Sequence, residues 1–164
     1  MLNRPGLEQL TTYSVEEADF AVRLDANEQP VNLPAAVRKE VLDRLATLAF
    51  NRYPEIGVAT LRQKIAAAMN LAVDGVLVGN GSSELLEAAC YAFGGPGRSI
   101  VFPTPSFSMY AIYAKLADSR PVPVPLGEDF FLGADDVLTA AREHQASLIL
   151  LCNPNNPTGS VMSD

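Results

Sequence analysis

Residues 148–159 have the sequence LILLCNPNNPTG, and this stretch decides the fold. Its first five residues are apolar, which is typical of a strand buried on both faces of a parallel sheet. The next seven combine two prolines, a glycine and three asparagines, a composition that favours a rigid turn with amide side chains able to bind a ligand. A turn directly after a buried strand lies where open α/β sheets bind their ligands.

Upstream of this stretch, short apolar runs alternate with helical patterns. The patterns predict strands at 75–79, 99–102 and 148–152, and helices at 83–93, 106–116 and 134–143. Residues 120–126 alternate proline with valine, and we predict an edge strand there because three prolines remove three ladder donors. The alternation predicts an α/β fold with a mainly parallel sheet layered with helices.

The N-terminal part of the chain is organised differently. Residues 1–33 carry little periodicity, and we interpret them as an extended arm. Apolar residues at spacings of three and four predict helices at 34–48 and 58–70. We therefore expect an N-terminal arm at 1–33, a helical segment at 34–74, and the first part of a large α/β domain at 75–164.

Composition excludes several classes of protein. The chain is 48% hydrophobic and 19% charged, as a packed globular core requires. Its net charge is −7 and its basic residues are scattered, which disfavours nucleic-acid binding. No apolar run is long enough for a membrane span or a secretory signal. We expect a cytoplasmic protein with no membrane partner and no metal site, and with Cys90 and Cys152 as free thiols.

Two further polar clusters follow predicted strands. Residues 79–84, GNGSSE, combine glycines that allow close backbone approach with serines that can cap the following helix. The start of a helix also attracts an anion such as a phosphate. Taken alone, the pattern is more typical of a simple capped turn than of a binding site.

The other cluster, PTPSFSMY at 103–110, places Phe107 and Tyr110 three residues apart just beyond a strand. Such rings can stack on a planar ligand. They can also simply pack the next helix against the sheet, and only one of them need contact a ligand.

Taken in order, these motifs resemble the fold type I, class I/II aminotransferases, which depend on pyridoxal 5'-phosphate. The resemblance is carried by NPNNPTG at 153–159, GNGSSE at 79–84, NRYPE at 51–55 and LDANEQP at 24–30. Within the family it is greatest to the histidinol-phosphate aminotransferase branch. It implies amino-group transfer between a small-molecule donor, histidinol phosphate, and a 2-oxo acid acceptor in histidine biosynthesis, by a homodimer.

The resemblance implies contacts with each part of the cofactor. Asn156 would hydrogen-bond its phenolic oxygen, and Phe107 would stack on its pyridine ring, with Tyr110 as the second candidate. The family commonly has tyrosine or tryptophan where Phe107 stands, so a hydroxyl hydrogen bond would be lost here.

The cofactor's phosphate would be bound by Gly81, Ser82 and Ser83. The family commonly has aspartate at the position of Ser83, and a serine can still cap a helix there.

Three residues upstream are implied in binding across the dimer and at the substrate. Tyr53 would reach the phosphate group bound by the partner subunit, and Asn27 and Glu28 would border the substrate.

The resemblance assigns no catalytic residue to this sequence. The lysine that holds the cofactor in the family lies beyond the NPTG turn, and the sequence ends five residues after Gly159. Lys39, Lys64 and Lys115 each lie on a predicted helix, and we expect them to be solvated charges. His144 is expected at the surface or at a helix C-cap. We expect the chain alone to be inactive.

Two other functions fit the same residues. A decarboxylase or an aromatic aminotransferase of the same fold would use the same cofactor contacts, because those contacts do not dictate which bond of the substrate breaks. A truncated, non-catalytic paralogue is the third interpretation.

Overall fold

A computed structural model describes residues 10, 19, 21–22, 24 and 26–162, which fall into two compact units. The described residues up to Val76, apart from Leu10, form the helical unit. Leu10 and residues 77–162 form the α/β unit. Most of the expected arm at 1–33 lies outside the described residues, and the three domain ranges stay predictions.

The helical unit contains both of the helices predicted for it. They are α1, Ala35–Ala46, and α2, Ala59–Met69, joined to two short 3₁₀ helices, η2 at Ile56–Val58 and η3 at Val73–Gly75. Residues 26–34 form neither helix nor strand. No residue of α1 is buried, so the apolar face predicted for this helix is exposed.

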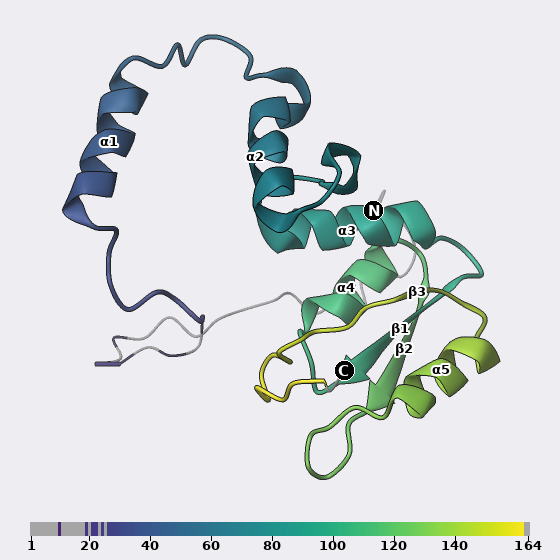
Figure 1. Cartoon of the computed structure of the whole chain (residues 1–164). Helices are drawn as coiled ribbons and strands as arrows, with labels where there is room; N and C mark the ends of the chain where they lie inside the picture. The colour runs from purple at the N-terminus through teal and green to yellow at the C-terminus, as the bar shows by residue number, and fades with distance from the viewer. Residues whose placement is uncertain (1–9, 11–18, 20, 23, 25, 163–164) are drawn as a thin grey trace. The chain divides into compact units, whose positions relative to one another are not determined.

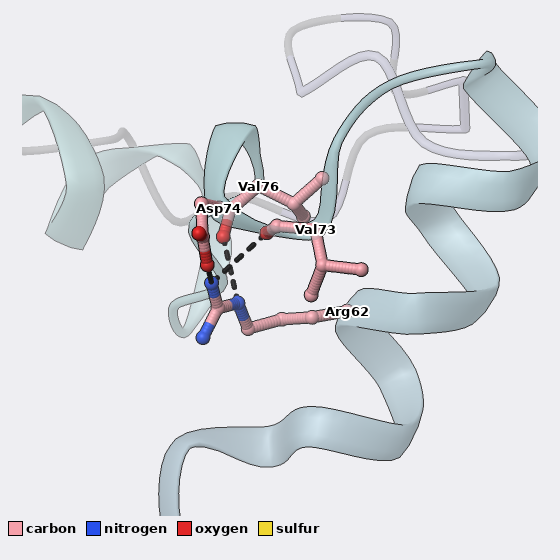
Figure 2. Close-up of polar contacts among 4 residues, drawn as sticks. All are labelled: Arg62, Val73, Asp74 and Val76. Atoms are coloured by element: carbon pink, nitrogen blue, oxygen red, sulfur yellow. Dashed lines mark hydrogen bonds and ion pairs between the residues drawn. The ribbon is translucent and has the colours of Figure 1, made fainter.

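The side chain of Arg62, on α2, hydrogen-bonds to the backbone at the end of the helical unit, as Figure 2 shows. Its Nε donates to the carbonyl oxygen of Val76 at 2.8 Å, and its Nη2 donates to that of Val73 at 2.9 Å. The Val76 N–H also donates to the Val73 carbonyl, at 3.1 Å. Val76 has extended dihedral angles, but its polar backbone groups are already used.

The strand predicted at 75–79 is therefore wrong. Gly75 ends η3, and residues 76–79 pair with no strand in the described part of the chain. The apolar pattern is compatible with a strand. In the structure, however, the N–H of Val76 donates to the 3₁₀ turn and its carbonyl accepts from Arg62, so neither group pairs with a neighbouring strand.

The α/β unit is built on three parallel strands in the order β2-β1-β3. They are β1, Ser99–Thr104, β2, Arg120–Pro125, and β3, Ala146–Ile149. The parallel α/β fold is confirmed. The proline-rich strand β2 lies at an edge, as its missing backbone donors predict.

Helices cover both faces of this sheet (Figure 1). They are α3, Gly81–Phe93, α4, Met109–Leu116, and α5, Ala134–Glu143. Because successive side chains of a strand point to opposite faces, Ile100 and Phe102 join the core beneath α3 and α4. Val101, between them, joins the core beneath α5. The bounds of α5 agree with its prediction.

The third strand is less buried than the sequence predicts. All four residues of β3 are half-buried, and Leu151 beyond it is 49% exposed. The expected fully buried strand at 148–152 is wrong because β3 is the second edge of the three-stranded sheet. Its pairing does continue to Leu150, whose N–H donates to the Val101 carbonyl at 2.9 Å.

Both cysteines are free thiols, as expected. Cys90 is fully buried, and burial, together with the nearby charge of Glu87, raises its pKa. No helix in the described ranges is long and apolar enough to cross a bilayer.

Candidate functional site

Two polar loops meet at the carboxyl end of the sheet. One follows β1 and the other follows β3, and these two strands are parallel neighbours. The Ser106 hydroxyl donates to Asn155 Oδ1 at 2.7 Å, and Asn155 Nδ2 donates to the Pro105 carbonyl at 3.0 Å. Asn155 is only 7% exposed. A buried amide therefore joins the loop that carries Phe107 to the turn that carries Asn156.

Internal hydrogen bonds hold the turn after β3. The Asn155 N–H donates to the Ser160 carbonyl at 2.8 Å, and the Gly159 N–H donates to the Asn155 carbonyl at 2.7 Å. Asn155 Nδ2 also donates to Thr158 Oγ1 at 2.8 Å. Gly159 has a φ of 73°, which glycine adopts without strain. The rigid turn expected from the sequence is present.

Asn156 differs from Asn155 in its surroundings. It is exposed, and its backbone N–H donates to Cys152 Sγ at 3.4 Å. Its side-chain amide has no hydrogen-bond partner within the part of the chain that the structure describes. This amide is thus available to a ligand, whereas the Asn155 amide is used within the protein.

The two candidate aromatic residues are also distinct. Tyr110 is 4% exposed in the core beneath α3 and α4, while Phe107 is half-buried beside it. Their rings meet edge-on, with centroids 5.6 Å apart. Burial, with a further contribution from Cys152, raises the pKa of Tyr110 to about 12. Of the pair, only Phe107 has appreciable exposed surface.

Gly81, Ser82 and Ser83 form the exposed first turn of α3. Gly81 has a φ of 77°, which a side chain would strain. The N–H groups of a first helical turn lack partners within the helix, so this end can bind an anion. No hydrogen bond or ring contact joins this turn to the two loops within the described residues.

The expectation that a serine caps α3 is wrong. The N-cap residue is Asn80, without a side-chain cap. Instead, the Glu84 carboxylate turns back and accepts a hydrogen bond from the Asn80 N–H. The hydroxyls of Ser82 and Ser83 make no hydrogen bond within the described structure, which leaves them free to donate to a ligand.

The other three site candidates belong to the helical unit. Tyr53 is 100% exposed, and Asn27 and Glu28 are exposed as well. Asn27 has a φ of 52°, a left-handed conformation that asparagine tolerates. Their roles at the site stay predictions.

The residues expected to have no catalytic role lie at the surface or at a helix end. Lys39, Lys64 and Lys115 are exposed on helices, and Lys39 pairs with Asp43 at 2.6 Å. His144 is the C-cap residue of α5, as expected.

Sequence reasoning missed the linking role of Asn155. Asn155 and Asn156 are adjacent and of the same type, so neither pattern nor composition distinguishes them. Ser106, whose hydroxyl meets the Asn155 amide, lies 49 residues upstream.

Comparison with known proteins shows the family of this chain. Residues 21–164 match the family described as aminotransferase class I and II. The chain is 35% identical to a histidinol-phosphate aminotransferase of Caldanaerobacter subterraneus, over 99% of this chain and 46% of the relative. It is 42% identical to histidinol-phosphate aminotransferase 2 of Burkholderia pseudomallei, over 94% of this chain and 44% of the relative.

A solved structure has a similar fold. The histidinol-phosphate aminotransferase of Clostridium acetobutylicum superposes with a TM-score of 0.71 and 25% identity. The superposition covers 85% of this chain and 39% of that one. The chain thus spans less than half the length of these relatives. Because the family match extends over most of its residues, the chain belongs to the class I and II aminotransferases.

Proposed function

We propose that this chain is part of a pyridoxal-phosphate-dependent histidinol-phosphate aminotransferase. The enzyme would transfer the amino group of histidinol phosphate to a 2-oxo acid, in histidine biosynthesis. The similarity to histidinol-phosphate aminotransferases over nearly the whole chain supports the substrate. The observation that carries the proposal is the Ser106–Asn155 hydrogen bond, since it places the loop of Phe107 against the turn of Asn156.

The residues present fit pyridoxal 5'-phosphate chemically. The cofactor has a phosphate dianion, a flat pyridine ring and a phenolic oxygen. The chain offers, in the same order, a helix start with two unused hydroxyls, the partly exposed ring of Phe107, and the unused amide of Asn156. When bound, the cofactor supplies an electron sink that stabilises negative charge on the substrate.

Each residue would then hold one part of the cofactor. The hydroxyls of Ser82 and Ser83 and the backbone at Gly81 would donate to the phosphate, where charge-assisted hydrogen bonds are strongest. The Phe107 ring would stack on the pyridine, and the Asn156 amide would donate to the phenolic oxygen. Tyr110 would support Phe107 from the core.

The helical unit would complete the site in a homodimer. Tyr53 would donate to the phosphate bound by the partner subunit, which its full exposure permits. Asn27 and Glu28 would border the substrate. We also propose that the enzyme is cytoplasmic.

An assay of the full-length protein tests the substrate. We expect kcat/KM for histidinol phosphate to exceed that for phenylalanine by about 100-fold or more, because a substrate pocket that binds the phosphate of histidinol phosphate, separately from that of the cofactor, discriminates strongly against a substrate without one. Equal values would favour an aromatic aminotransferase. Release of carbon dioxide from phenylalanine, without formation of an amino acid from 2-oxoglutarate, would favour a decarboxylase.

The 164-residue chain provides a separate test of catalytic competence. We expect no transamination by this chain alone, and no stoichiometric labelling of Lys39, Lys64 or Lys115 by pyridoxal phosphate and borohydride, since these lysines are exposed on helices. Labelling at a single one of them would contradict this expectation. A full-length protein that ends at the same residue would support a non-catalytic paralogue.

A further inference from the structure

We propose that Asn155 is a positioning residue that fixes Phe107 and Asn156 relative to each other, so that the ring and the amide of the site move as one body. The proposal rests on the function proposed above, because it concerns the two residues assigned to the pyridine ring and the phenolic oxygen. Asn155 itself would not touch the cofactor, since it is 7% exposed and its amide is used within the protein.

The hydrogen bonds determine which way the Asn155 amide points. Nδ2 lies 3.0 Å from the Pro105 carbonyl oxygen, which can only accept. If the amide were rotated by half a turn, its oxygen would face that carbonyl, and two acceptors would repel each other. Oδ1 is therefore the atom that accepts from the Ser106 hydroxyl, at 2.7 Å.

The same amide directs a second hydroxyl in the turn. Asn155 Nδ2 donates to Thr158 Oγ1 at 2.8 Å, and the Ser160 N–H donates to the same oxygen at 3.4 Å. With both lone pairs used, Thr158 must direct its own proton to Ser160 Oγ, 2.8 Å away. The side chains of Ser106, Asn155, Thr158 and Ser160 thus form one chain of hydrogen bonds across the two loops.

This chain is coupled closely to the two site residues. Phe107 directly follows Ser106, and Asn156 directly follows Asn155, so a displacement of either partner passes through a single peptide unit. The backbone of Asn156 is also held by Cys152 Sγ. Loss of the Asn155 amide would therefore allow both loops to open together.

Hydrogen–deuterium exchange of the full chain tests the coupling without a ligand. We expect Asn155→Ala to accelerate exchange about tenfold in both segments 104–108 and 153–160, and to leave α5 unchanged. Ser147→Ala is the matched control, since it removes a side-chain bond between the same two strands, to the Ser99 carbonyl at their other end. Faster exchange in one segment only, or throughout the α/β unit, would overturn the proposal.

A binding experiment with the same variants tests the consequence for the site. Pyridoxamine 5'-phosphate is used because it lacks the aldehyde, and inorganic phosphate is used as the second ligand. We expect the nearly isosteric Asn155→Asp to weaken pyridoxamine phosphate about tenfold and phosphate less than twofold, because only the ring contacts are displaced. A general loss of structure would weaken both ligands in parallel, and that result would refute the positioning role.

A double-mutant cycle with Phe107→Ala shows whether Asn155→Asp weakens pyridoxamine phosphate binding by displacing Phe107 or by an effect independent of Phe107. If Asn155 acts through Phe107, the loss caused by Asn155→Asp shrinks in the Phe107→Ala background. Fully additive losses would overturn the proposal. If the full-length protein without substitutions binds neither ligand, the proposed function fails, whereas the exchange experiment still decides whether Asn155 couples the two loops.

Discussion

The rings of Phe107 and Tyr110 meet edge-on, with their planes at 86° and their centroids 5.6 Å apart. Tyr110 is buried and also contacts Phe102, with centroids 6.1 Å apart. The tyrosine therefore acts as a support in the core, and the phenylalanine presents the remaining surface of the pair. We therefore expect substitutions of the partly exposed ring, Phe107, and of the buried ring, Tyr110, to have different effects.

Replacing Phe107 by alanine should affect both binding and stability. The edge-on contact contributes about 0.5–1.5 kcal/mol beyond the burial of a half-buried ring, so we expect a loss of roughly 2 kcal/mol in the free energy of unfolding. Affinity for pyridoxamine phosphate should fall about tenfold, because stacking is lost. Phe107→Tyr keeps the ring and should retain both properties. Urea unfolding and ligand titration measure the two effects, and a tyrosine variant as weak as the alanine variant would contradict the stacking role.

Most elements of the α/β unit could be predicted from the sequence, because strong local patterns specify them. The pattern of α5 predicts its bounds, and the prolines of β2 predict its edge position. The prediction failed at 75–79 and in the burial of β3, since both depend on which segments lie alongside. Local periodicity carries no information about such neighbours.

The candidate site was predictable as a set of residues, but its internal organisation was not. The sequence indicates that an asparagine of the turn after β3 can bind a ligand. Only the three-dimensional structure shows that the Asn155 side-chain amide hydrogen-bonds to Pro105 and Ser106, whereas the Asn156 amide remains available to a ligand. In the same way, Ser82 and Ser83 become candidate donors because neither hydroxyl caps α3 or makes another hydrogen bond within the described residues.

Removing the Ser82 hydroxyl should weaken phosphate binding selectively. A hydrogen bond to a charged group contributes about 1.5–3 kcal/mol, so Ser82→Ala should weaken inorganic phosphate at least about tenfold. Stability should change little, because this serine is exposed and makes no cap bond. Thr139→Ala, at an exposed position of α5, is the control for loss of a hydroxyl. Equal affinities of Ser82→Ala and the unaltered chain would exclude this serine from the anion site.

Tyr110 should make the α/β unit sensitive to alkaline pH. Its pKa is about 12 in the folded protein and about 10 in an unfolded chain, so between these values the folded state retains a proton that the unfolded state releases. Stability from this group is complete below pH ~10 and is lost as pH rises towards 12. Relative to Tyr110→Phe, the unaltered chain should lose roughly 2–3 kcal/mol over this interval.

Urea unfolding at a series of pH values measures this difference. Tyr91→Phe is the control, because Tyr91 lies in the same unit and is 56% exposed. Parallel pH profiles for the unaltered chain and Tyr110→Phe would show that burial of the phenol does not govern the alkaline transition.

Arg62 should be the principal stabilising residue of the turn at the end of the helical unit. A lysine at this position keeps the positive charge. Its single ammonium group cannot reproduce the two separate guanidinium donors with which Arg62 bonds the carbonyls of Val73 and Val76. We expect Arg62→Lys to destabilise this turn by about 1–2 kcal/mol, seen as faster hydrogen exchange at residues 72–76.

The control lies within the same cluster. The Asp74 carboxylate is 3.8 Å from Arg62 Nη2, and its side chain is fully exposed, so the ion pair is screened by solvent. Asp74→Asn should therefore leave exchange at 72–76 unchanged, while Arg62→Lys accelerates it. If Asp74→Asn accelerated exchange as much as Arg62→Lys, the ion pair with Asp74 would contribute as much to the turn as the two backbone hydrogen bonds, contrary to this prediction. Insensitivity of exchange at 72–76 in the unaltered chain to added salt would further support the role of the two backbone hydrogen bonds over that of the ion pair (Figure 2).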